Sequence, residues 1–444
     1  MLPWVRRHIK SHLFLIIIVL YILSLYLKCT LPPYPGPYTV GTIDIEVPIS
    51  EPRLFSNTTL KSTNQPAFKL ESVLFTLFYP ATEDLTPPTH HKWMTPISGF
   101  ARGYRSYLRL PWILTPLLTL TIRSFVSSTL IPAGVNLPLH GTRNLYHPSH
   151  QPLESYPLPP FPVIIFSHGT SATRSSYTHL CGSLASRGYI VAALEHRDGS
   201  APYTLIHTNP RYPIFAEHLS PPLNPGEVKE AQLAFREAEV NEVLALLSRI
   251  GSGEGGDIAA QNFRGEGHHL AAWEGRVGDL IIAGHSFGGT LALQLSRPPF
   301  VGGVVLDPGK TSGPLNEDVT VPILVVNSEA WSRDDSHFKA VRGLVLKAMD
   351  EGRRFAWFLT ARGMGHASFT DASVLVPRLI EFLRGGRGGP QGVGDVVVAF
   401  VRGLEDGIRR GVLGWDVGPP DGEWEVHVAP STMCPYPGLC GVEP

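Results

Sequence analysis

The sequence is poor in charged residues and has no excess of either sign. Only 17% of its 444 residues are charged, and 37 Lys and Arg against 38 Asp and Glu leave a formal net charge of −1. Such a chain has no overall field that favours nucleic acid or another polyanion, which argues against that class of partner. It has no internal repeat at a fixed spacing, and its 44 glycines and 41 prolines lack a collagen-like period. With 43% hydrophobic residues, most of the chain is predicted to fold.

The N-terminus carries a signal for the secretory pathway. Three basic residues precede an apolar run of 15 residues, 13–27. This length is short of the ~20 residues of a spanning helix and at the upper end of a signal-peptide core. Because no small-x-small cleavage site follows, residues 1–30 are predicted to form an uncleaved signal anchor, with a cleaved signal peptide of a secreted protein as the alternative. After Lys28 no basic residue occurs until Arg53, which places the N-terminus in the cytosol and the remainder in the lumen or outside.

Two weaker features agree with a luminal or extracellular location. Asn57 begins the only glycosylation sequon, within residues 31–69, which we interpret as a Pro-rich luminal linker. The chain has only four cysteines, of which Cys434 and Cys440 bracket a Pro/Gly turn and could close a small disulfide loop in an oxidising lumen. Cys181 is predicted to be a buried thiol.

Residues 70–384 alternate apolar runs with helical segments, which predicts a catalytic domain with a doubly wound, mostly parallel α/β sheet. The apolar runs are continuous rather than alternating, as expected for parallel strands buried on both faces. Helices are expected at 227–250 and 372–383, and the Gly-rich stretch 251–269 is predicted to be a flexible loop. The predicted strands are Ser72–Tyr79, Pro162–Phe166, Tyr189–Ala193, Leu280–Ala283, Gly303–Leu306, Val321–Val326 and Phe355–Leu359.

Two segments lie outside this alternation. The apolar stretch 93–139 is broken by Pro111 and Pro116, which argues against a second membrane span. We expect either a helical cap packed on the core or a lid that contacts a lipid interface beside the active site. Residues 385–444 form a Gly-rich hinge and a tail, in which 396–411 could make one short amphipathic helix. The tail is expected to dock on the core or to be partly disordered.

The most informative motif is Gly-His-Ser-Phe-Gly at residues 284–288. It matches Gly-x-Ser-x-Gly at the point where a predicted strand turns into a helix, which is the context of a nucleophile elbow. The glycines two residues either side relieve crowding at the sharp turn, and the helix that follows points its amides at the site. Ser286 is therefore the predicted nucleophile.

A serine nucleophile needs a base and an acid that orients it, which follow in the order Ser, Asp, His in this fold class. His366 lies in the loop after the last predicted strand and is the predicted base, whereas the competing His337 falls in a predicted helix. Asp307 ends a strand before a Pro-Gly turn, which exposes its carboxylate at the sheet edge. Asp334 and Asp335 follow the next strand, the more usual place, but in a polar stretch typical of a solvated loop. We therefore favour Asp307 as the acid.

Two backbone N–H groups should face the charge that develops on the substrate oxygen. Phe287, directly after the nucleophile, is predicted to supply the first. The second N–H is predicted to come from Thr170, in the loop after the strand at 162–166, where Gly169 leaves space because it has no side chain. His168 is expected to brace this loop and not to transfer protons.

These residues resemble the platelet-activating-factor acetylhydrolase family, of the single-chain secreted and intracellular type, over roughly Leu70 to Leu383. The resemblance implies an α/β-hydrolase fold with Ser286, Asp307 and His366 as the triad, with Phe287 and Thr170 as oxyanion donors, and with no metal or other cofactor. The loop at 251–269, the tail and Pro308 after the acid depart from the family pattern. The motifs are Phe78-Tyr79-Pro80, Phe166–Gly169, Ser186–Ala193, Glu195-His196-Arg197-Asp198-Gly199-Ser200 and Gly284–Gly289.

The resemblance also implies a substrate class. We expect a serine esterase that removes short or oxidised sn-2 acyl chains from phospholipids at a membrane or lipoprotein surface, without calcium and without an obligate protein partner. A general lipase or carboxylesterase would share every catalytic residue and is the first alternative. A membrane-anchored binding protein with a dead site is the second.

Overall fold

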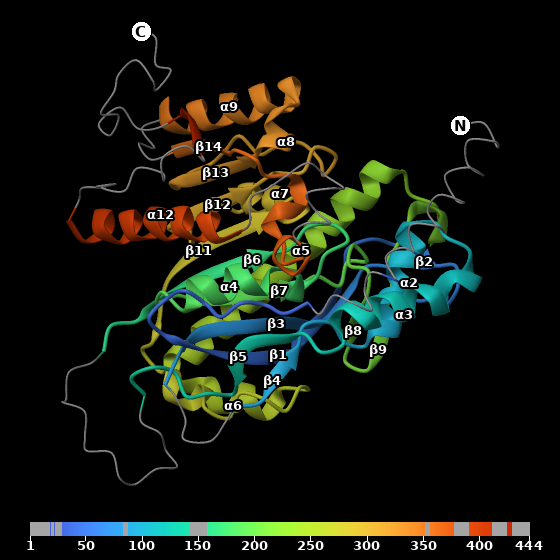
Figure 1. Ribbon diagram of the computed structural model, residues 1–444, viewed down its shortest axis with the longest axis horizontal. Coiled ribbons are helices and arrows are strands. Elements are labelled where there is room, and N and C mark those ends of the chain that lie inside the picture. The colour runs from blue at the N-terminus through green and yellow to red at the C-terminus, as the bar shows by residue number, and fades with distance from the viewer. Residues whose placement is uncertain are drawn as a thin grey trace.

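The protein is built around an eleven-stranded sheet (Figure 1). The computed structural model describes residues 29–82, 88–142, 158–350, 356–376, 390–410 and 424–428, together with Ile18 and Ile22. The strand order is β15-β14-β13-β12-β11-β6-β7-β3-β1-β5-β4, in which β14 to β7 are parallel. Beyond β7 the pairs β7–β3, β3–β1 and β5–β4 are antiparallel, and β1–β5 is parallel. The strands are β1 Thr39–Leu54, β3 Lys69–Ala81, β4 His90–Lys92, β5 Leu130–Val135, β6 Phe161–Ser167, β7 Ile190–Glu195, β11 Val277–His285, β12 Gly302–Leu306, β13 Ile323–Ser328, β14 Ala356–Ala361 and β15 Trp424–Val428.

Helices cover both faces of the sheet, which explains why its strands are apolar throughout. In β6, Val163 and Ile165 pack into one hydrophobic cluster, and Ile164 and Phe166 pack into the other. The first cluster includes α5, α7 and α9, and the second includes α4 and α12. The helices are α2 Ile97–Tyr107, α3 Thr115–Val126, α4 Thr178–Ala185, α5 Pro225–Arg249, α6 Gly255–Gln261, α7 Phe287–Gln294, α8 Glu329–Ser332, α9 Asp335–Asp350, α10 Ala372–Leu375 and α12 Pro390–Arg410.

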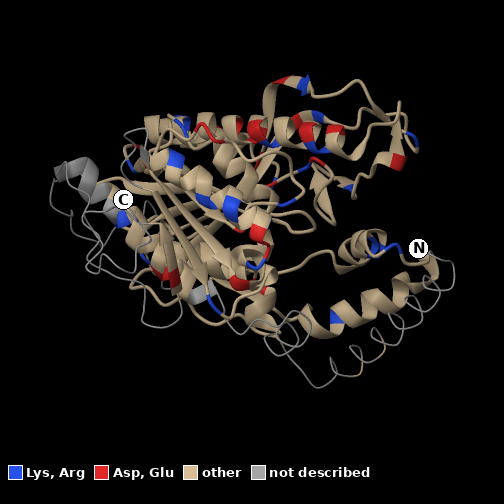
Figure 2. Ribbon diagram, turned by 90° about the horizontal axis from the view of Figure 1, so that it is seen from above, with Lys and Arg blue, Asp and Glu red and all other residues tan. Residues whose placement is uncertain are grey.

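Short elements complete the architecture. The pairs β2–β10 and β8–β9 form two small sheets beside the main one. Charged residues of both signs are interspersed along the chain, in keeping with the balanced composition (Figure 2). The short elements are β2 Thr59–Leu60, β8 Thr204–Ile206, β9 Asn209–Arg211, β10 Leu219–Ser220, η1 Trp112–Leu114, η2 Arg174–Tyr177, η3 Ala216–His218, η4 Ile250–Glu254, η5 Leu270–Trp273 and η6 His366–Phe369.

The prediction of a doubly wound, mostly parallel sheet is confirmed, and each predicted strand is present. The interpretation of residues 31–69 as a linker was wrong, because this segment contains β1, which pairs with β3 along its length. Its alternating apolar residues Ile43, Ile45 and Val47 are buried, and this period of two was visible in the sequence. Asn57 of the sequon is exposed just beyond β1.

The prediction of a flexible loop at 251–269 was wrong for residues 251–261, which continue α5 through the π-helical η4 into α6. Residues 262–269 form turns that connect α6 to η5. The glycines of the helical part permit close packing: a Cβ on Gly255 would lie 2.1 Å from the carbonyl oxygen of Leu270. Ile258 of α6 is buried against the main core. Glycine here serves a close approach between helices and does not mark mobility.

The segment expected to form a cap or a lid is mainly helical. Segment 93–139 contains α2, η1 and α3, followed by β5. The predicted final helix is described only as α10, because residues 377–389 lie outside the described part of the chain. The predicted anchor at 13–27 also lies outside it, apart from Ile18 and Ile22. Among the described residues, no helix has the length and hydrophobicity needed to cross a membrane.

The tail docks on the domain, one of the two outcomes expected for it. Helix α12 buries Val393, Val397 and Val401 in the cluster on the α4 face. Beyond it, β15 adds an antiparallel edge strand to β14, which the sequence analysis missed. Cys434 and Cys440 lie outside the described residues, so their pairing stays a prediction.

Replacing Val401 by Asp should destabilise the fold by about 3 kcal/mol, because a carboxylate would be buried without a partner. Thermal unfolding monitored by circular dichroism measures the effect. The neighbouring Arg402 is exposed, and Arg402→Asp is the matched control, with an expected change within about 0.5 kcal/mol. Equal stabilities of the two variants would mean that α12 is not part of the core.

Candidate active site

The turn between β11 and α7 holds Ser286 in a strained conformation. Its φ of 57° and ψ of −117° are rare for a residue with a side chain. The backbone around it leaves no room for Cβ atoms: one on Gly284 would lie 2.1 Å from the Gly288 oxygen, and one on Gly288 would lie 2.0 Å from the Ser167 oxygen. The glycines of the motif are therefore required by close backbone contacts, as a nucleophile elbow demands.

The structure brings together the three residues predicted to form the triad. His366 Nε2 lies 3.0 Å from Ser286 Oγ, and His366 Nδ1 lies 2.9 Å from Asp307 Oδ2. Ser286 directly follows β11, Asp307 directly follows β12, and His366 lies in the loop after β14. The imidazole can thus accept a proton from the hydroxyl while its other nitrogen donates to the carboxylate.

Asp307 is fully buried and fixed by its neighbours. Its Oδ1 accepts the Ser328 N–H at 2.6 Å, and its Oδ2 accepts the Ser328 hydroxyl at 2.6 Å. The competing acids point elsewhere: Asp334 pairs with Lys310 at 3.1 Å and Asp335 with Lys339 at 2.6 Å. The geometry therefore agrees with the choice of Asp307. The competing base His337 lies in α9, as predicted.

The His366 ring is held between two other rings. The Trp331 indole stacks on it with 3.9 Å between centroids and 10° between planes. The indole Nε1–H donates to the Pro308 oxygen at 2.8 Å. On another side, the ring centroid of His285 is 4.5 Å away. Burial keeps the pKa of His285 well below its ordinary value, so this second imidazole is neutral.

Asp371 ties the loop that carries His366 to the domain. This buried carboxylate accepts hydrogen bonds from the Trp93 indole at 2.8 Å, from the Thr178 N–H at 2.9 Å and hydroxyl at 2.6 Å, and from the His179 N–H at 2.9 Å. Two of these donors are backbone amides at the N-terminus of α4, where a negative charge is favourable. The loop is thereby anchored to a helix and to the cap.

The predicted oxyanion donors lie on either side of the serine. Phe287 is the first residue of α7, and the N–H of Thr170 makes no hydrogen bond to the described residues. Gly169 must lack a side chain, because its Cβ would lie 2.9 Å from that of Ser286. Lys229 Nζ donates to the Thr170 hydroxyl at 3.3 Å, and burial lowers the pKa of this lysine to about 8.

A cavity of about 190 Å³ opens at the serine. It is lined by residues of the cap, of the loop after β6 and of the loop that carries His366. The lining residues are Trp93, Tyr104, Gly169, Thr170, Ser171, Ala172, Ser176, Tyr177, His285, Ser286, His366, Ala367, Thr370 and Ala372.

Three side chains of the site are of metal-ligating types. One ligand atom from each of His285, Asp307 and His366 lies within 4.8 Å of the others, the only such group among the described residues. Each of them already makes a hydrogen bond within the site: His366 Nδ1 to Asp307, and His285 Nδ1 to the Tyr177 hydroxyl at 2.7 Å. Side chains that are hydrogen-bonded in this way fit the transfer of a proton better than the binding of a metal ion.

Sequence analysis missed several residues that shape the site. Ser328, Trp331 and Asp371 each act on a triad residue through a contact between distant segments. No local motif marks them. Tyr177 is similar: its hydroxyl accepts the Gly169 N–H at 3.2 Å and also bonds His285.

The sheet and the site together define an α/β hydrolase. A solved structure with this fold, a ferulic acid esterase from Streptomyces cinnamoneus, superposes with a TM-score of 0.55 at 18% identity, covering 90% of this chain and 99% of that one. Residues 24–389 match the family described as "Platelet-activating factor acetylhydrolase, isoform II". The chain belongs to this family, and the resemblance inferred from its motifs is confirmed.

Curated relatives carry names consistent with that family. A platelet-activating factor acetylhydrolase of Cavia porcellus is 28% identical over 389 residues, 85% of this chain and 75% of its own. That of Canis lupus familiaris is 28% identical over 321 residues, 69% and 65% of the two chains. A putative phospholipase A2 of Schizosaccharomyces pombe is 28% identical over 290 residues, 61% and 59%. The chain thus spans about three-fifths to three-quarters of these relatives, and membership supports hydrolysis of phospholipids or other esters.

Removing the indole of Trp331 should lower kcat for a short-chain ester about tenfold, because His366 would lose the surface that fixes its ring plane. Trp331→Phe keeps a flat ring and should retain most of the activity, whereas Trp331→Ala should not. Steady-state kinetics of both variants decide this. Equal activities would show that stacking does not position the base.

Proposed function

We propose that the protein is a serine esterase that cleaves the sn-2 acyl ester of phospholipids carrying a short or oxidised chain, such as platelet-activating factor. The observation that carries the proposal is the pair of hydrogen bonds that connects Ser286 Oγ through His366 to Asp307. Support for the substrate class comes from the family and from the names of the relatives.

The proposed reaction proceeds in two steps. His366 takes the proton of Ser286 as Oγ attacks the ester carbonyl, and Asp307 stabilises the resulting imidazolium. The N–H groups of Phe287 and Thr170 stabilise the oxyanion, each by about 2.7–4 kcal/mol. The protonated His366 then gives its proton to the leaving alcohol. Water activated by the same residue releases the acid from the acyl-enzyme.

The cavity supports a preference for short chains. About 190 Å³ beside Ser286 is below the range of roughly 300–1,000 Å³ for sites that enclose drug-sized ligands. An acetyl or shortened oxidised chain fits such a space, whereas a long saturated chain would have to leave it.

Ser286→Ala should lower turnover of 2-acetyl phospholipid by roughly 10⁴-fold or more while leaving the fold intact. The assay uses phospholipids with graded sn-2 chains in the presence of a calcium chelator, and turnover should fall as the chain lengthens. Wild-type activity of the alanine variant would refute the serine mechanism. Faster turnover of acylglycerols than of phospholipids would identify a general lipase instead.

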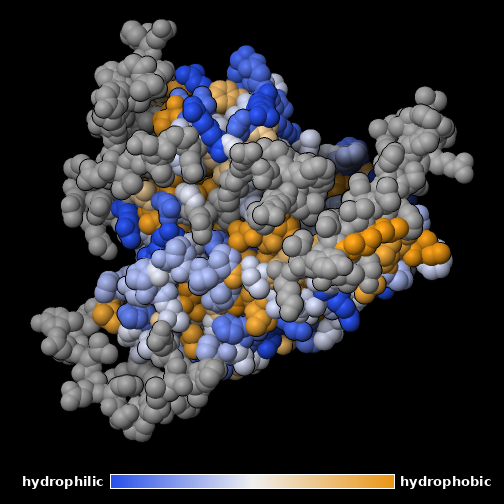
Figure 3. Space-filling model, in the orientation of Figure 1, coloured by the Kyte–Doolittle hydropathy of each residue, from blue (hydrophilic) through white to orange (hydrophobic). Residues whose placement is uncertain are grey.

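An exposed apolar surface supports action at a lipid surface. Trp112 and Ile113 in η1 are 78% and 66% exposed, and Leu108 and Leu120 flank them with about half of their surface exposed. Figure 3 shows exposed hydrophobic surface, drawn in orange, over the α2–α3 unit. Tyr104 of α2 lines the cavity, so this unit reaches from the patch to the site.

Replacing both Trp112 and Ile113 by Ser should weaken binding to phosphatidylcholine vesicles by about 3 kcal/mol, since two large side chains would no longer be buried in lipid. Vesicle hydrolysis should fall, and hydrolysis of a soluble ester should stay within about twofold of wild type. Leu54→Ser is the control, because Leu54 is 59% exposed on β1. Equal losses on both substrates would remove the interfacial role. Leu118 is unsuitable for this test because it is buried.

A further inference from the structure

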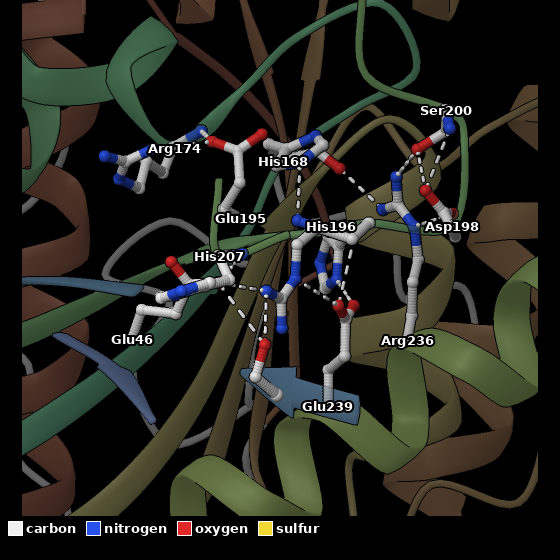
Figure 4. Close-up of polar contacts among 12 residues, drawn as sticks. Glu46, His168, Arg174, Glu195, His196, Asp198, Ser200, His207, Arg236 and Glu239 are labelled. Carbon is white, nitrogen blue, oxygen red and sulfur yellow. Dashed lines mark hydrogen bonds and ion pairs between the residues drawn. The ribbon is translucent and has the colours of Figure 1, made fainter. Parts of the chain in front are cut away.

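A network of buried charged residues joins the segment after β7 to α5 (Figure 4). The motif from Glu195 to Ser200 follows β7, and all of its side chains are at most 2% exposed. Arg236 and Glu239 of α5 meet it from the other side and are equally buried. Such charges are tolerated only when each has hydrogen-bonding partners. The proposed mechanism assigns no role to any of them.

Within this network, Arg236 contacts both segments that carry the proposed oxyanion donors. Its Nη1 donates to the carbonyl oxygen of His168 at 2.7 Å, two residues before Thr170. Its guanidinium carbon lies 4.3 Å from the ring centroid of Phe287, the residue that carries the other donor. Arg236 is thus a direct link between the two halves of the proposed oxyanion hole.

Asp198 and Ser200 fix the guanidinium and the loop together. Arg236 Nε donates to Asp198 Oδ2 at 2.8 Å, and Nη2 donates to the Ser200 hydroxyl at 2.6 Å. Asp198 Oδ1 in turn accepts the Ser200 N–H at 2.9 Å and its hydroxyl at 2.5 Å. The Ser200 carbonyl then accepts the N–H of Ser171 at 2.8 Å. The loop is held on both sides of Thr170, while the N–H of Thr170 is left available.

Ser167, His196 and Glu239 repeat the bonding order of the triad in the interior. Ser167 Oγ lies 2.7 Å from His196 Nε2, and His196 Nδ1 lies 2.6 Å from Glu239 Oε2. Burial and the nearby Arg236 keep the pKa of His196 well below its ordinary value, so the imidazole is neutral. Because the three side chains are closed off from solvent, the set braces the end of β6, whose last carbonyl contacts Gly288.

We propose that Arg236 is a positioning residue that sets the distance and orientation of the Thr170 and Phe287 N–H groups. This inference rests on the proposed serine mechanism. A planar guanidinium can bond His168, Asp198 and Ser200 at once while its face lies on an aromatic ring. A lysine at position 236 would keep the positive charge but would lose the planar, forked arrangement of N–H donors. Oxyanion donors act only when they are held close to the transition-state geometry.

The test compares Arg236→Lys with Arg197→Lys. Arg197 is also buried, and its guanidinium bonds Glu46 at 2.8 Å and Ser72 at 2.9 Å and lies 3.8 Å from Glu239, so these partners are not on the segments of Thr170 and Phe287. We expect Arg236→Lys to lower kcat for a soluble short-chain ester at least about tenfold with KM changed little. Arg197→Lys should keep kcat per folded molecule. Both should lower Tm, which is measured in parallel.

A trifluoromethyl ketone inhibitor gives a readout that a merely structural role would not move. Ser286 Oγ adds to the ketone carbon, its proton passes to His366, and the carbonyl oxygen becomes an oxyanion in the hole. For Arg236→Lys the inhibition constant should rise by the same factor as kcat/KM falls. Ser200→Ala removes one contact of the guanidinium and leaves only a small cavity. It should also raise the inhibition constant and lower kcat/KM. This variant keeps the test valid if Arg236→Lys folds poorly.

The outcomes separate this inference from the proposed function. Unchanged inhibition and kcat in both Arg236→Lys and Ser200→Ala would overturn the positioning role, and so would equal kcat losses in Arg236→Lys and Arg197→Lys. A kcat loss in Arg236→Lys that Arg197→Lys does not share, together with inactive Ser286→Ala, agrees with it. Full activity of Ser286→Ala would instead overturn the serine mechanism itself.

Discussion

The site depends on the close backbone contacts that surround Ser286. The Ser286 N–H donates to the Leu306 oxygen at 2.9 Å, and the Gly309 N–H donates to the Ser286 oxygen at 3.0 Å. These two bonds bracket Asp307, so the strained turn at Ser286 and the position of the Asp307 carboxylate are set by the same contacts. His366 then needs only to occupy the space between two fixed groups. Its ring plane is determined by Trp331 and its loop by Asp371.

Burial explains why the oxyanion side is built from charges with several partners each. In a low-dielectric interior an unpaired guanidinium would cost several kcal/mol. Arg236 avoids this cost through Asp198, Ser200 and the His168 carbonyl. The same bonds hold the backbone of the loop, because they end on main-chain as well as side-chain atoms. The hydrogen bonds that stabilise the buried charge of Arg236 therefore also hold the loop after β6 in place.

The sequence was sufficient to predict the strands of the parallel core, and it pointed to Ser286, Asp307 and His366, which the structure brings within hydrogen-bonding distance. Both depend on local patterns and on chain order. It was not sufficient for α5. The sequence predicts a helix at 227–250 but gives no sign that some of its polar side chains are buried. In the structure Gln232, Arg236 and Glu239 are buried. Ser328, Trp331 and Asp371 were missed for a related reason, since their roles come from contacts that no spacing encodes.

The cap and the oxyanion network meet at one residue. The Tyr107 hydroxyl of α2 donates to the Ser200 carbonyl, which also accepts the Ser171 N–H. The Ser200 hydroxyl accepts from Arg236. Because Leu108, the residue directly after α2, is one of the exposed apolar residues, the element that would rest on lipid is bonded to the element that orients the proposed oxyanion donors. On the proposals made above, contact with lipid and the geometry of the transition state are linked through Ser200. A second link runs through Trp93, because its indole donates to Asp371, which anchors the loop of His366.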